Sequence, residues 1–322
     1  MSSRHAPSEH ELEAAYCWET SDRVPGRPEM TAFRRQIRLH QARWREGQGH
    51  PVGSQPIRPL PDGPPARPVG SRLPLDYARS TGANFLTANA LDAASARLAA
   101  KEPHQMFDTQ RLWADLLSSP SMCFNLFGDL TADHDLADRA IQTWWPDAPG
   151  SVNELRFAHS PGRLDATYLG NLCALDVAVV LGLDDGTQGV IGIATKYHDR
   201  TYRQPPKPSR LARYIDITKT SGIFAPGAID AVNGTDLIHI WLDHLLVLSM
   251  LQHPSGDWTW GRHVVVHPAG NTDHVEACAR YRELLTDQAT FASASVEDLL
   301  DADILPASTT AALRLRYLPE AP

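Results

Sequence analysis

The fold is decided by Leu175-Asp176-Val177-Ala178-Val179-Val180-Leu181 and, after a turn, Val190-Ile191-Gly192-Ile193-Ala194-Thr195-Lys196-Tyr197. Both segments are apolar and rich in β-branched residues, as strands are. The turn between them, Gly182-Leu183-Asp184-Asp185-Gly186-Thr187-Gln188-Gly189, has the Asp and Gly content that is typical of hairpins. An antiparallel hairpin would bring Asp176 close to residues 194–196 at one edge of a sheet.

The charged residues of this hairpin carry the first functional signal. An acid on one strand and an acid-x-Lys sequence on the next is the arrangement that metal-dependent nucleases use. Asp176 and Lys196 fit it, but Ala194 stands where the second acid is expected. Lys196 is one of four lysines, against twenty-six arginines, and it ends an apolar run. The alternative is that Lys196 simply extends from a strand end into water.

The composition is that of a globular chain. With 322 residues and 42% hydrophobic content, we expect one large domain or a domain with an N-terminal extension. No apolar run is long enough for a membrane span, and the first residues lack a signal-peptide core. The four cysteines, Cys17, Cys123, Cys173 and Cys278, form no C-x-x-C pair. Reduced thiols, no zinc site, no membrane segment and a cytoplasmic location are therefore expected.

Positive charge is concentrated near the N-terminus. The net charge is −8, but residues 23–72 hold ten arginines against three carboxylates, so the rest of the chain has a net charge of about −15. Within this segment 33–45 has helical periodicity, and Arg34, Arg35 and Arg38 could contact phosphates. The alternative is an amphipathic helix packed on the domain. Residues 47–74, rich in Gly and Pro, predict an extended strap. We expect an N-terminal helix and strap over 1–82 and a compact domain over 83–322.

The remaining pattern predicts an α/β fold. Helices are expected near 86–100, 110–117, 133–144, 236–252, 273–287 and 296–302, and strands near 152–158, 174–181, 190–197 and 262–267. The central order is helix, three strands, helix, strand. This order predicts a mixed sheet flanked by helices.

Eight segments add a family resemblance. They are Phe33–Arg45, Val69–Leu73, Gly82–Thr87, Arg111–Ser119, Cys123–Gly128, His159–Arg163, Ile191–His198 and His267–Asn271. With the acid on the second strand and the lysine on the third, the chain resembles the PD-(D/E)XK nuclease superfamily. More narrowly, it is similar to a family of bacterial restriction-endonuclease-like proteins.

This resemblance implies a restriction-endonuclease-like core with an Arg-rich N-terminal extension. It also implies hydrolysis of DNA phosphodiester bonds by metal-activated water. Double-stranded DNA is the expected partner. Mg²⁺, with Mn²⁺ as a substitute, would be held by Asp176 and the backbone carbonyl of Thr195. Lys196 would orient the water or neutralise charge on the phosphate. Many nucleases of this fold dimerise, so a homodimer is a further expectation.

Ala194 departs from the family pattern, which has Glu there. Three interpretations stay open: a natural non-cutting protein, an inactivated variant, or a site in which another acid, such as Asp199, Glu154 or Asp165, has become the ligand. Ala158, where we expect an acid before the His-Ser-Pro-Gly-Arg segment, favours inactivation. Impaired hydrolysis is therefore expected, and the alternative is a non-catalytic DNA-binding or assembly protein.

Other candidates have both a functional and a structural interpretation. His159 and His198 could assist proton transfer or bind a phosphate, or could be structural hydrogen bonders. Arg163 could clamp a phosphate or pair with a carboxylate. Asp243, on the helix near 236–252, is expected to be a packing or capping residue. No Gly-x-Ser-x-Gly, Gly-x-Gly-x-x-Gly or P-loop sequence is present, which argues against a serine hydrolase and against nucleotide-driven chemistry.

Overall fold

The computed structural model describes residues 6–17, 32–58, 63 and 65–319. Its helices are α1 (Glu9–Ala14), α2 (Ala32–Gly47), α3 (Leu75–Thr81), α4 (Ala88–Ala99), α5 (Thr109–Ala114), α6 (Ser119–Phe127), the 3₁₀ helix η2 (Gly128–Thr131), α7 (His134–Trp144), α8 (Pro208–Ser221), α9 (Ala228–Val232), α10 (Ile238–Leu251), α11 (Thr272–Glu283), α12 (Val296–Asp301) and α13 (Ala307–Tyr317). Its strands are β1 (Gly53–Gln55), β2 (Arg67–Val69), β3 (Ser151–His159), β4 (Leu175–Gly182), β5 (Gln188–Thr195), β6 (Trp258–His267) and β7 (Phe291–Ser295). Within the described ranges, no helix combines the length and the apolar character that crossing a membrane requires.

A mixed five-stranded sheet forms the centre of the fold, in the order β3-β4-β5-β6-β7. The pairs β3–β4 and β4–β5 are antiparallel, whereas β6 and β7 run parallel to β5 and to each other. Val177 pairs with Ile193 in the β4–β5 hairpin, and Ile193 pairs with Val264 across the parallel ladder. The predicted hairpin and the predicted mixed sheet flanked by helices are confirmed.

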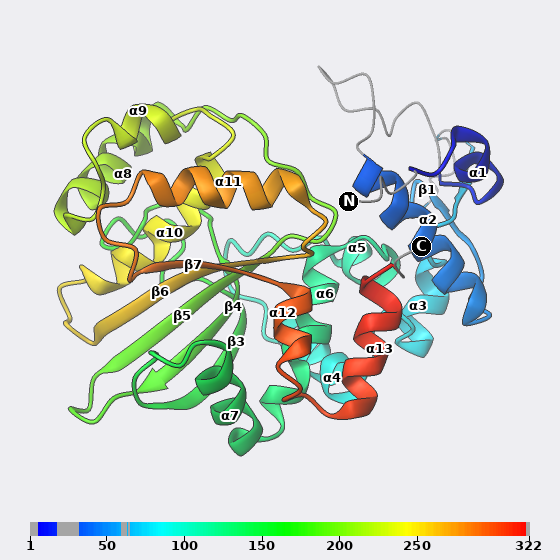
Figure 1. Ribbon diagram of the computed structural model, residues 1–322, viewed down its shortest axis with the longest axis horizontal. Coiled ribbons are helices and arrows are strands. Elements are labelled where there is room, and N and C mark those ends of the chain that lie inside the picture. The colour runs from blue at the N-terminus through cyan, green and yellow to red at the C-terminus, as the bar shows by residue number, and fades with distance from the viewer. Residues whose placement is uncertain (1–5, 18–31, 59–62, 64, 320–322) are drawn as a thin grey trace.

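Helices cover both faces of this sheet (Figure 1). Alternating residues of β4 and β5 separate into two cores, as the period of two in a strand requires. Val177, Val179 and Ile193 face α4, α6, α7, α12 and α13. Ala178 and Val180 face α8, α10 and α11 on the other side. Because both faces are buried, these strands are almost continuously apolar.

A glycine sets the distance between α10 and the sheet. A Cβ added to Gly192 would lie 2.6 Å from Cγ2 of Val247 on α10. Without that Cβ, the helix settles directly on β5. Lys196 follows Gly192 by four residues just past the end of β5, and Asp243 precedes Val247 by one helical turn. The close packing of α10 therefore carries Asp243 toward the Lys196 end of β5.

The predicted order of elements is confirmed with small shifts at the ends. Asp108 and Asp133 cap α5 and α7 through side-chain hydrogen bonds, as N-cap residues do. The strand β7 and the helices α1, α3, α6, α8, α9 and α13 are absent from the prediction. Phe291–Ser295 is short and has only one large apolar residue, so its sequence gives a weak strand signal. It becomes a strand because the exposed edge of β6 pairs with it.

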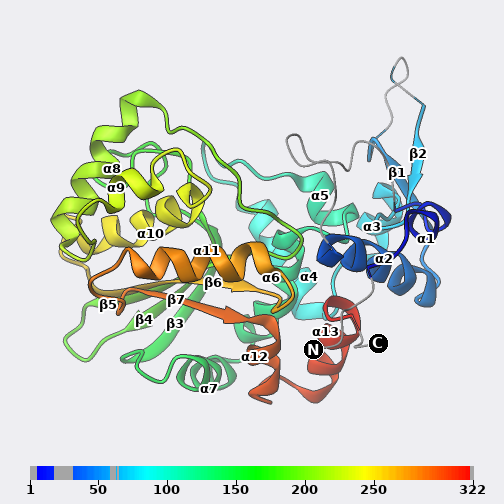
Figure 2. The same cartoon turned by 45° about the horizontal axis from the view of Figure 1, so that its top comes forward.

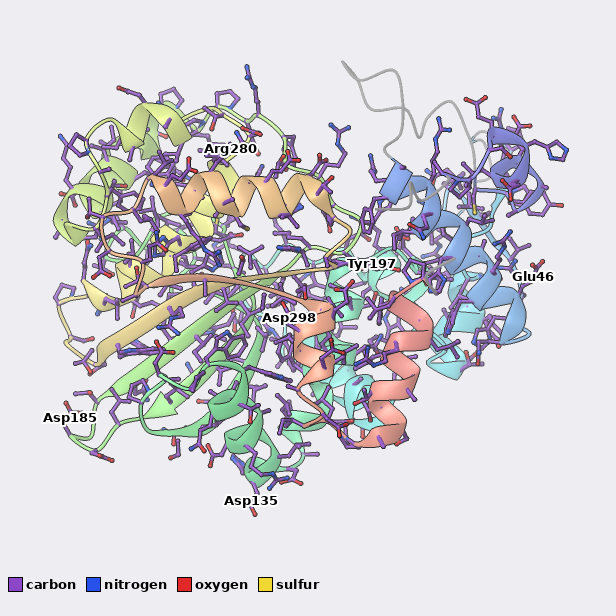
Figure 3. All side chains as sticks on the ribbon, in the orientation of Figure 1. Glu46, Asp135, Asp185, Tyr197, Arg280 and Asp298 are labelled. Atoms are coloured by element: carbon purple, nitrogen blue, oxygen red, sulfur yellow. The ribbon has the colours of Figure 1, made fainter. Side chains whose placement is uncertain are left out.

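The N-terminal helix α2 packs against the C-terminal helix α13 (Figure 2). The Gln41 side-chain amide donates to the Tyr197 hydroxyl at 2.7 Å and to the Arg316 carbonyl at 2.5 Å. Tyr197 lies where these helices approach the end of the sheet (Figure 3). The predicted strap contains the antiparallel pair of β1 and β2. Residues 1–5, 18–31, 59–62 and 64, which belong to the predicted N-terminal region, lie outside the described residues.

Candidate active site

Asp176 is held at the start of β4 by the neighbouring strand. Its Oδ2 accepts hydrogen bonds from the Thr195 backbone N–H at 2.7 Å and from the Thr195 hydroxyl at 3.0 Å. Burial raises the pKa of the Asp176 carboxyl, while the charge of Lys196 and the Thr195 hydrogen bonds oppose that rise. Thr195 therefore orients the carboxylate that the sequence predicts as the principal metal ligand.

Lys196 faces a carboxylate that the sequence analysis did not assign to the site. Its Nζ lies 3.7 Å from Oδ2 of Asp243, and the two side chains are 23% and 15% exposed. Burial acts to lower the pKa of Lys196, but the charges of Asp243, Asp176 and Asp199 outweigh it and raise that pKa. For Asp243, burial and the charge of Asp176 raise the pKa to about 6, against the pull of Lys196. Lys196 thus lies among three acids from three segments.

Ala194 lies on β5, two residues before Lys196. It is 3% exposed and pairs with Val265 in the β5–β6 ladder. The alternation of β5 puts Ala194, Gly192 and Lys196 on one face, the face that α10 covers. A carboxylate at position 194 would therefore point toward the same space that Asp243 approaches from the helix.

Two polar residues hold the segment that follows β5. The Ser119 hydroxyl accepts from the Tyr197 N–H at 2.8 Å and donates to the Asp199 carboxylate. The Asn271 amide donates to the carbonyls of Lys196, Tyr197 and Asp199 at 3.2–3.4 Å. These contacts fix the backbone from Lys196 to Asp199.

The sequence matches a known protein family over most of its length. A model described as the PD-(D/E)XK nuclease superfamily matches residues 28–319. The chain belongs to the PD-(D/E)XK nuclease superfamily. Neither a curated protein nor a solved structure matches it. The superfamily implies nuclease activity with DNA as the substrate, and its members generally use divalent metals such as Mg²⁺. In this superfamily the conserved lysine follows the second acid by two residues, so Ala194 is a departure within an otherwise matching strand pair.

The donor set fits a hard divalent cation. Asp176 and Asp243 supply carboxylate oxygens beside Lys196, and Mg²⁺ is usually held by one or two carboxylates completed by water and phosphate. Among the described residues, no three or more His, Cys, Asp or Glu side chains are grouped so that they could hold a metal ion. The residues present therefore suit Mg²⁺ or Mn²⁺ and do not resemble a closed structural zinc site.

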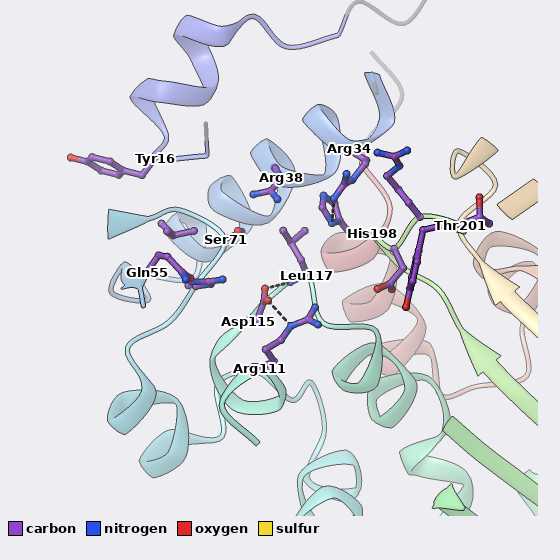
Figure 4. Close-up of a pocket in the computed structure, with 15 residues that line it drawn as sticks. Tyr16, Arg34, Arg38, Gln55, Ser71, Arg111, Asp115, Leu117, His198 and Thr201 are labelled. Carbon is purple, nitrogen blue, oxygen red and sulfur yellow. Dashed lines mark hydrogen bonds and ion pairs between the residues drawn. The ribbon is translucent and has the colours of Figure 1, made fainter. Parts of the chain in front are cut away.

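Several of the other predicted site residues line one of two cavities. Arg34, Arg38, His198 and Asp199 line a cavity of about 610 Å³ (Figure 4). Burial and the charges of Arg38, Arg34 and Arg111 lower the pKa of His198 far below its usual value, so this imidazole is neutral. Arg35 lies 4.0 Å from Glu9 on α1 instead.

His159 and Glu154 line a different cavity, of about 580 Å³, between β3 and α4. Burial and the charge of Arg156 lower the pKa of His159 to about 4. Arg163 is an ion-pair partner of Glu102 and donates to the Ala158 carbonyl at 2.9 Å. These contacts match the carboxylate-pairing interpretation of Arg163, whereas His159 Nε2 has no hydrogen-bond partner among the described residues.

Asp165 lies in an exposed turn. Its Oδ1 accepts from the Thr167 N–H at 2.8 Å and from the Thr167 hydroxyl at 2.7 Å. Ala158 has a left-handed φ of 47°, an unusual conformation for a residue with a Cβ, and lines a cavity of about 230 Å³ together with Asp176. The structure therefore places Ala158, but not Asp165, beside the principal carboxylate.

Sequence reasoning missed Asp243 and the arginines Arg72, Arg111 and Arg200. Asp243 comes 47 residues after Lys196 in the sequence, so no spacing rule links them. A usable signal was present, because Asp243 is the single Asp or Glu in the helix Ile238–Leu251, which is otherwise strongly apolar. A lone acid on a buried helix needs a charged partner, and that requirement could have pointed to Lys196.

Proposed function

We propose that this protein is a metal-dependent endonuclease acting on DNA, in which Asp243 supplies the second carboxylate that position 194 lacks. The observation that carries this proposal is the meeting of Asp176, Asp243 and Lys196 at the end of β5. Each group comes from a different element, and the Lys196–Asp243 distance of 3.7 Å leaves both within reach of one phosphate. Asp243 on α10 would then take the metal-binding role that the family pattern assigns to an acid at position 194 on β5.

The chain's own residues suggest distinct roles. Thr195 keeps Asp176 oriented by two hydrogen bonds, so the carboxylate is preorganised before substrate binds. Lys196 stays protonated at neutral pH, so it can neutralise charge on a phosphate oxygen or orient an attacking water. When bound, Mg²⁺ or Mn²⁺ would supply the activation of water and the polarisation of the phosphate. Asp176, Asp243 and the carbonyl of Thr195 are the proposed ligands.

We further propose that the protein prefers double-stranded DNA, forms a homodimer and is located in the cytoplasm. We also propose that the chain divides into an N-terminal region at 1–82 and a nuclease domain at 83–322. Asp199, which also lies near Lys196, is the next candidate ligand, whereas Glu154 belongs to the cavity beside α4. We also predict that Ala194 impairs hydrolysis. The degree of impairment depends on whether Asp243 serves in place of an acid at position 194.

A second candidate function rests on the same ion pair. If the Lys196–Asp243 contact is permanent, both groups are neutralised by each other and the site binds DNA without cutting it. The non-catalytic alternative is then the correct one. Binding by such a protein would depend on salt but not on a divalent metal.

The experiment measures cutting and metal binding in parallel. Supercoiled plasmid and linear DNA are incubated with Mg²⁺ or Mn²⁺, and Mn²⁺ affinity is measured by calorimetry without DNA. The variants are Asp176→Asn, Asp243→Asn and Lys196→Met, with Asp135→Asn as the control. Asp135 is an exposed acid at the start of α7, far from the site (Figure 3). The proposal expects Asp176→Asn and Asp243→Asn to weaken Mn²⁺ binding and to abolish cutting, and Asp135→Asn to do neither.

Two results would contradict the proposal. If wild-type protein binds no Mn²⁺ and cuts no DNA but binds DNA in a salt-dependent way, the non-catalytic function is supported. If wild-type protein cuts and Asp243→Asn cuts equally well, the second ligand is a different acid, and Asp199→Asn becomes the deciding variant. Ala194→Glu then shows whether the strand position alone limits the rate.

A further inference from the structure

A cavity of about 580 Å³ lies between helix α4 and strand β3, which is at one end of the strand order. Its helical wall contains Ala93, Ala96 and Ala100, which recur at intervals of three and four residues and therefore share one face of the helix. The opposite wall contains Leu155 and Phe157, which point to the same side of β3 because they are two residues apart. Since alanine side chains are short, an apolar space remains between the two walls.

The charged groups around this space are largely paired with one another. The Arg97 guanidinium donates to three backbone carbonyls at 2.7–3.3 Å and lies 3.2 Å from a carboxylate oxygen of Glu102. Arg156 forms an ion pair with Glu154. With Asp92, the lining holds three carboxylates against two guanidinium groups. A phosphate would meet a net negative charge here, so the cavity suits a neutral ligand.

The lining also contains a buried polar atom with no partner among the described residues. His159 is 9% exposed, and its Nε2 makes no hydrogen bond within the described part of the chain. Burial and the charge of Arg156 lower the pKa of His159 to about 4, so the ring is neutral near pH 7. A neutral imidazole nitrogen donates or accepts one hydrogen bond, depending on the tautomer. Buried polar atoms normally have a partner, and a ligand with a polar edge would supply one.

These properties together define the chemistry of the ligand. The volume of about 580 Å³ lies within the roughly 300–1,000 Å³ of pockets that enclose one small molecule, so a duplex is too large for it. A neutral heteroaromatic ring fits the cavity, because its faces are apolar and its edge carries hydrogen-bonding atoms. A phosphate conflicts with the charges of the lining, and an aliphatic chain leaves His159 Nε2 without a partner.

The cavity lies beside the carboxylate site. His159 ends β3 and pairs with Leu175, and Asp176 is the next residue on β4. Ala158, the residue before His159, lines the smaller cavity of about 230 Å³ that contains Asp176. The two cavities therefore adjoin at the end of β3. A DNA strand that places a phosphate beside Asp176 would bring its neighbouring bases to this part of the sheet.

Building on the function proposed above, we propose that the cavity between α4 and β3 binds a single nucleobase, with Ala96 and Phe157 toward its two faces and His159 at its polar edge. One source of the base is the DNA strand whose phosphate lies at Asp176, with the nucleotide turned out of the stack. The other source is a free nucleoside. The choice of a nucleobase among neutral rings rests on the proposed nuclease function, and the two sources are distinguished by experiment.

Binding of the base without a phosphate is measured first. The four deoxynucleosides are titrated by calorimetry into the protein in EDTA. Ala96→Phe places a ring in the cavity from an exposed position of α4, and Ala99→Phe adds the same ring at an exposed position that does not line it. We expect at least one deoxynucleoside to bind, with affinity reduced roughly tenfold or more by Ala96→Phe and within about twofold in Ala99→Phe.

His159→Leu tests the polar edge. We expect the preferred deoxynucleoside to bind roughly fivefold more weakly and the discrimination among the four bases to fall, because one hydrogen bond is lost. The melting temperature should not fall, since the variant removes a buried nitrogen that has no partner among the described residues. A lower melting temperature with unchanged discrimination would show that His159 is structural and would overturn its role in binding the base.

DNA decides the source of the base. Duplexes with 2-aminopurine at a mismatch report unstacking by a rise in fluorescence, and a mismatched base is the least costly to turn out. A rise with wild type and Ala99→Phe but not with Ala96→Phe assigns the base to the DNA strand. Deoxynucleoside binding without such a rise assigns it to a free nucleoside. If neither the fluorescence nor any deoxynucleoside affinity depends on residue 96, the proposal is overturned.

The two proposals fail in different ways. Cutting that Asp243→Asn abolishes, together with base binding that Ala96→Phe leaves unchanged, keeps the nuclease and overturns the base-binding cavity. Base binding that Ala96→Phe removes, with no cutting of DNA in any metal, supports the cavity and rejects the nuclease.

Discussion

The ammonium of Lys196 lies 3.7 Å from a carboxylate oxygen of Asp243, which joins the end of β5 to the middle of α10. Asp243 can approach Lys196 because Gly192 has no side chain, which lets α10 pack directly on β5. Asp176 lies close enough for its charge to raise the pKa of Asp243. Position 194 lacks an acid, but Asp243 on α10 supplies a carboxylate beside Lys196, two residues further along the chain.

An exchange of acids between helix and strand tests this arrangement. Asp243→Asn should weaken Mn²⁺ binding by roughly tenfold or more, because one of two carboxylates is lost. Adding Ala194→Glu to that variant should restore part of the binding and of the cutting. Calorimetry and plasmid cleavage on the same samples measure both effects. Failure of the double variant to bind Mn²⁺ better than Asp243→Asn, with its melting temperature unchanged, would contradict the exchange.

The raised pKa of Asp243 predicts a pH dependence of stability. Its folded pKa of about 6 exceeds the ordinary 3.8, so between these values the folded state binds more protons than the unfolded state. This group therefore stabilises the fold below about pH 4, and its contribution falls as pH rises through 6. The loss is of the order of 3 kcal/mol for a shift of about two pKa units.

Urea unfolding in EDTA at pH 4.5 and pH 6.5 measures this effect. Other carboxyls, such as Asp147 beside Arg262, have lowered pKa values and act in the opposite direction. The comparison with Asp243→Asn isolates the one group, because the amide doesn't titrate. The wild type should lose stability relative to that variant between the two pH values, and equal changes in both proteins would refute the assignment.

The sequence predicts the sheet well because its strands have a simple physical signal. Asp176 and Lys196 stand out as charges in apolar strands, and the hairpin turn brings them together. Asp243 could not be placed in the same way, since the packing of α10 on Gly192 is a tertiary contact that no local pattern encodes. The same holds for Arg72, Arg111 and Arg200, which meet only in the folded chain. His159 and Arg163, close to Asp176 in the sequence, instead lie among residues beside α4.

The junction of α2 and α13 depends on a buried arginine. Arg316 is fully buried, its guanidinium lies 4.4 Å from the centre of the Trp44 ring, and it donates to the Asn84 carbonyl at 2.9 Å. Arg316→Ala should cost about 3 kcal/mol of unfolding free energy, because charged hydrogen bonds are lost and a cavity is left. Arg314→Ala, two residues away and paired with Asp301 at the surface, should cost less than about 1 kcal/mol.

Urea denaturation of the two variants measures this difference. If both cost the same, the buried contacts of Arg316 contribute little and α2 is only loosely attached. That outcome would also favour the predicted division of the chain at residue 82. A large loss confined to Arg316→Ala would show that the buried contacts of Arg316 with Asn84 and Trp44 stabilise the fold.

The distance between α10 and β5 should control the site without any change in its charged groups. Gly192→Ala places a Cβ 2.6 Å from Val247 Cγ2 and 2.8 Å from Leu175 Cδ1, so α10 must move outward. We expect a cost of about 1–3 kcal/mol from overpacking, together with weaker Mn²⁺ binding and slower cutting as Asp243 moves away from Lys196. Gly47→Ala, which meets no atom within 4 Å, is the control.

A double variant separates this geometric effect from simple destabilisation. Val247→Ala removes the methyl groups that the new Cβ would contact, so Gly192→Ala with Val247→Ala should let α10 return toward β5. Stability would stay low, because a core valine is missing, but Mn²⁺ affinity should recover toward that of the wild type. Recovery of the affinity without recovery of the stability is the result that links the packing of α10 to the site. If affinity falls in proportion to stability in every variant, the position of Asp243 is not what controls metal binding.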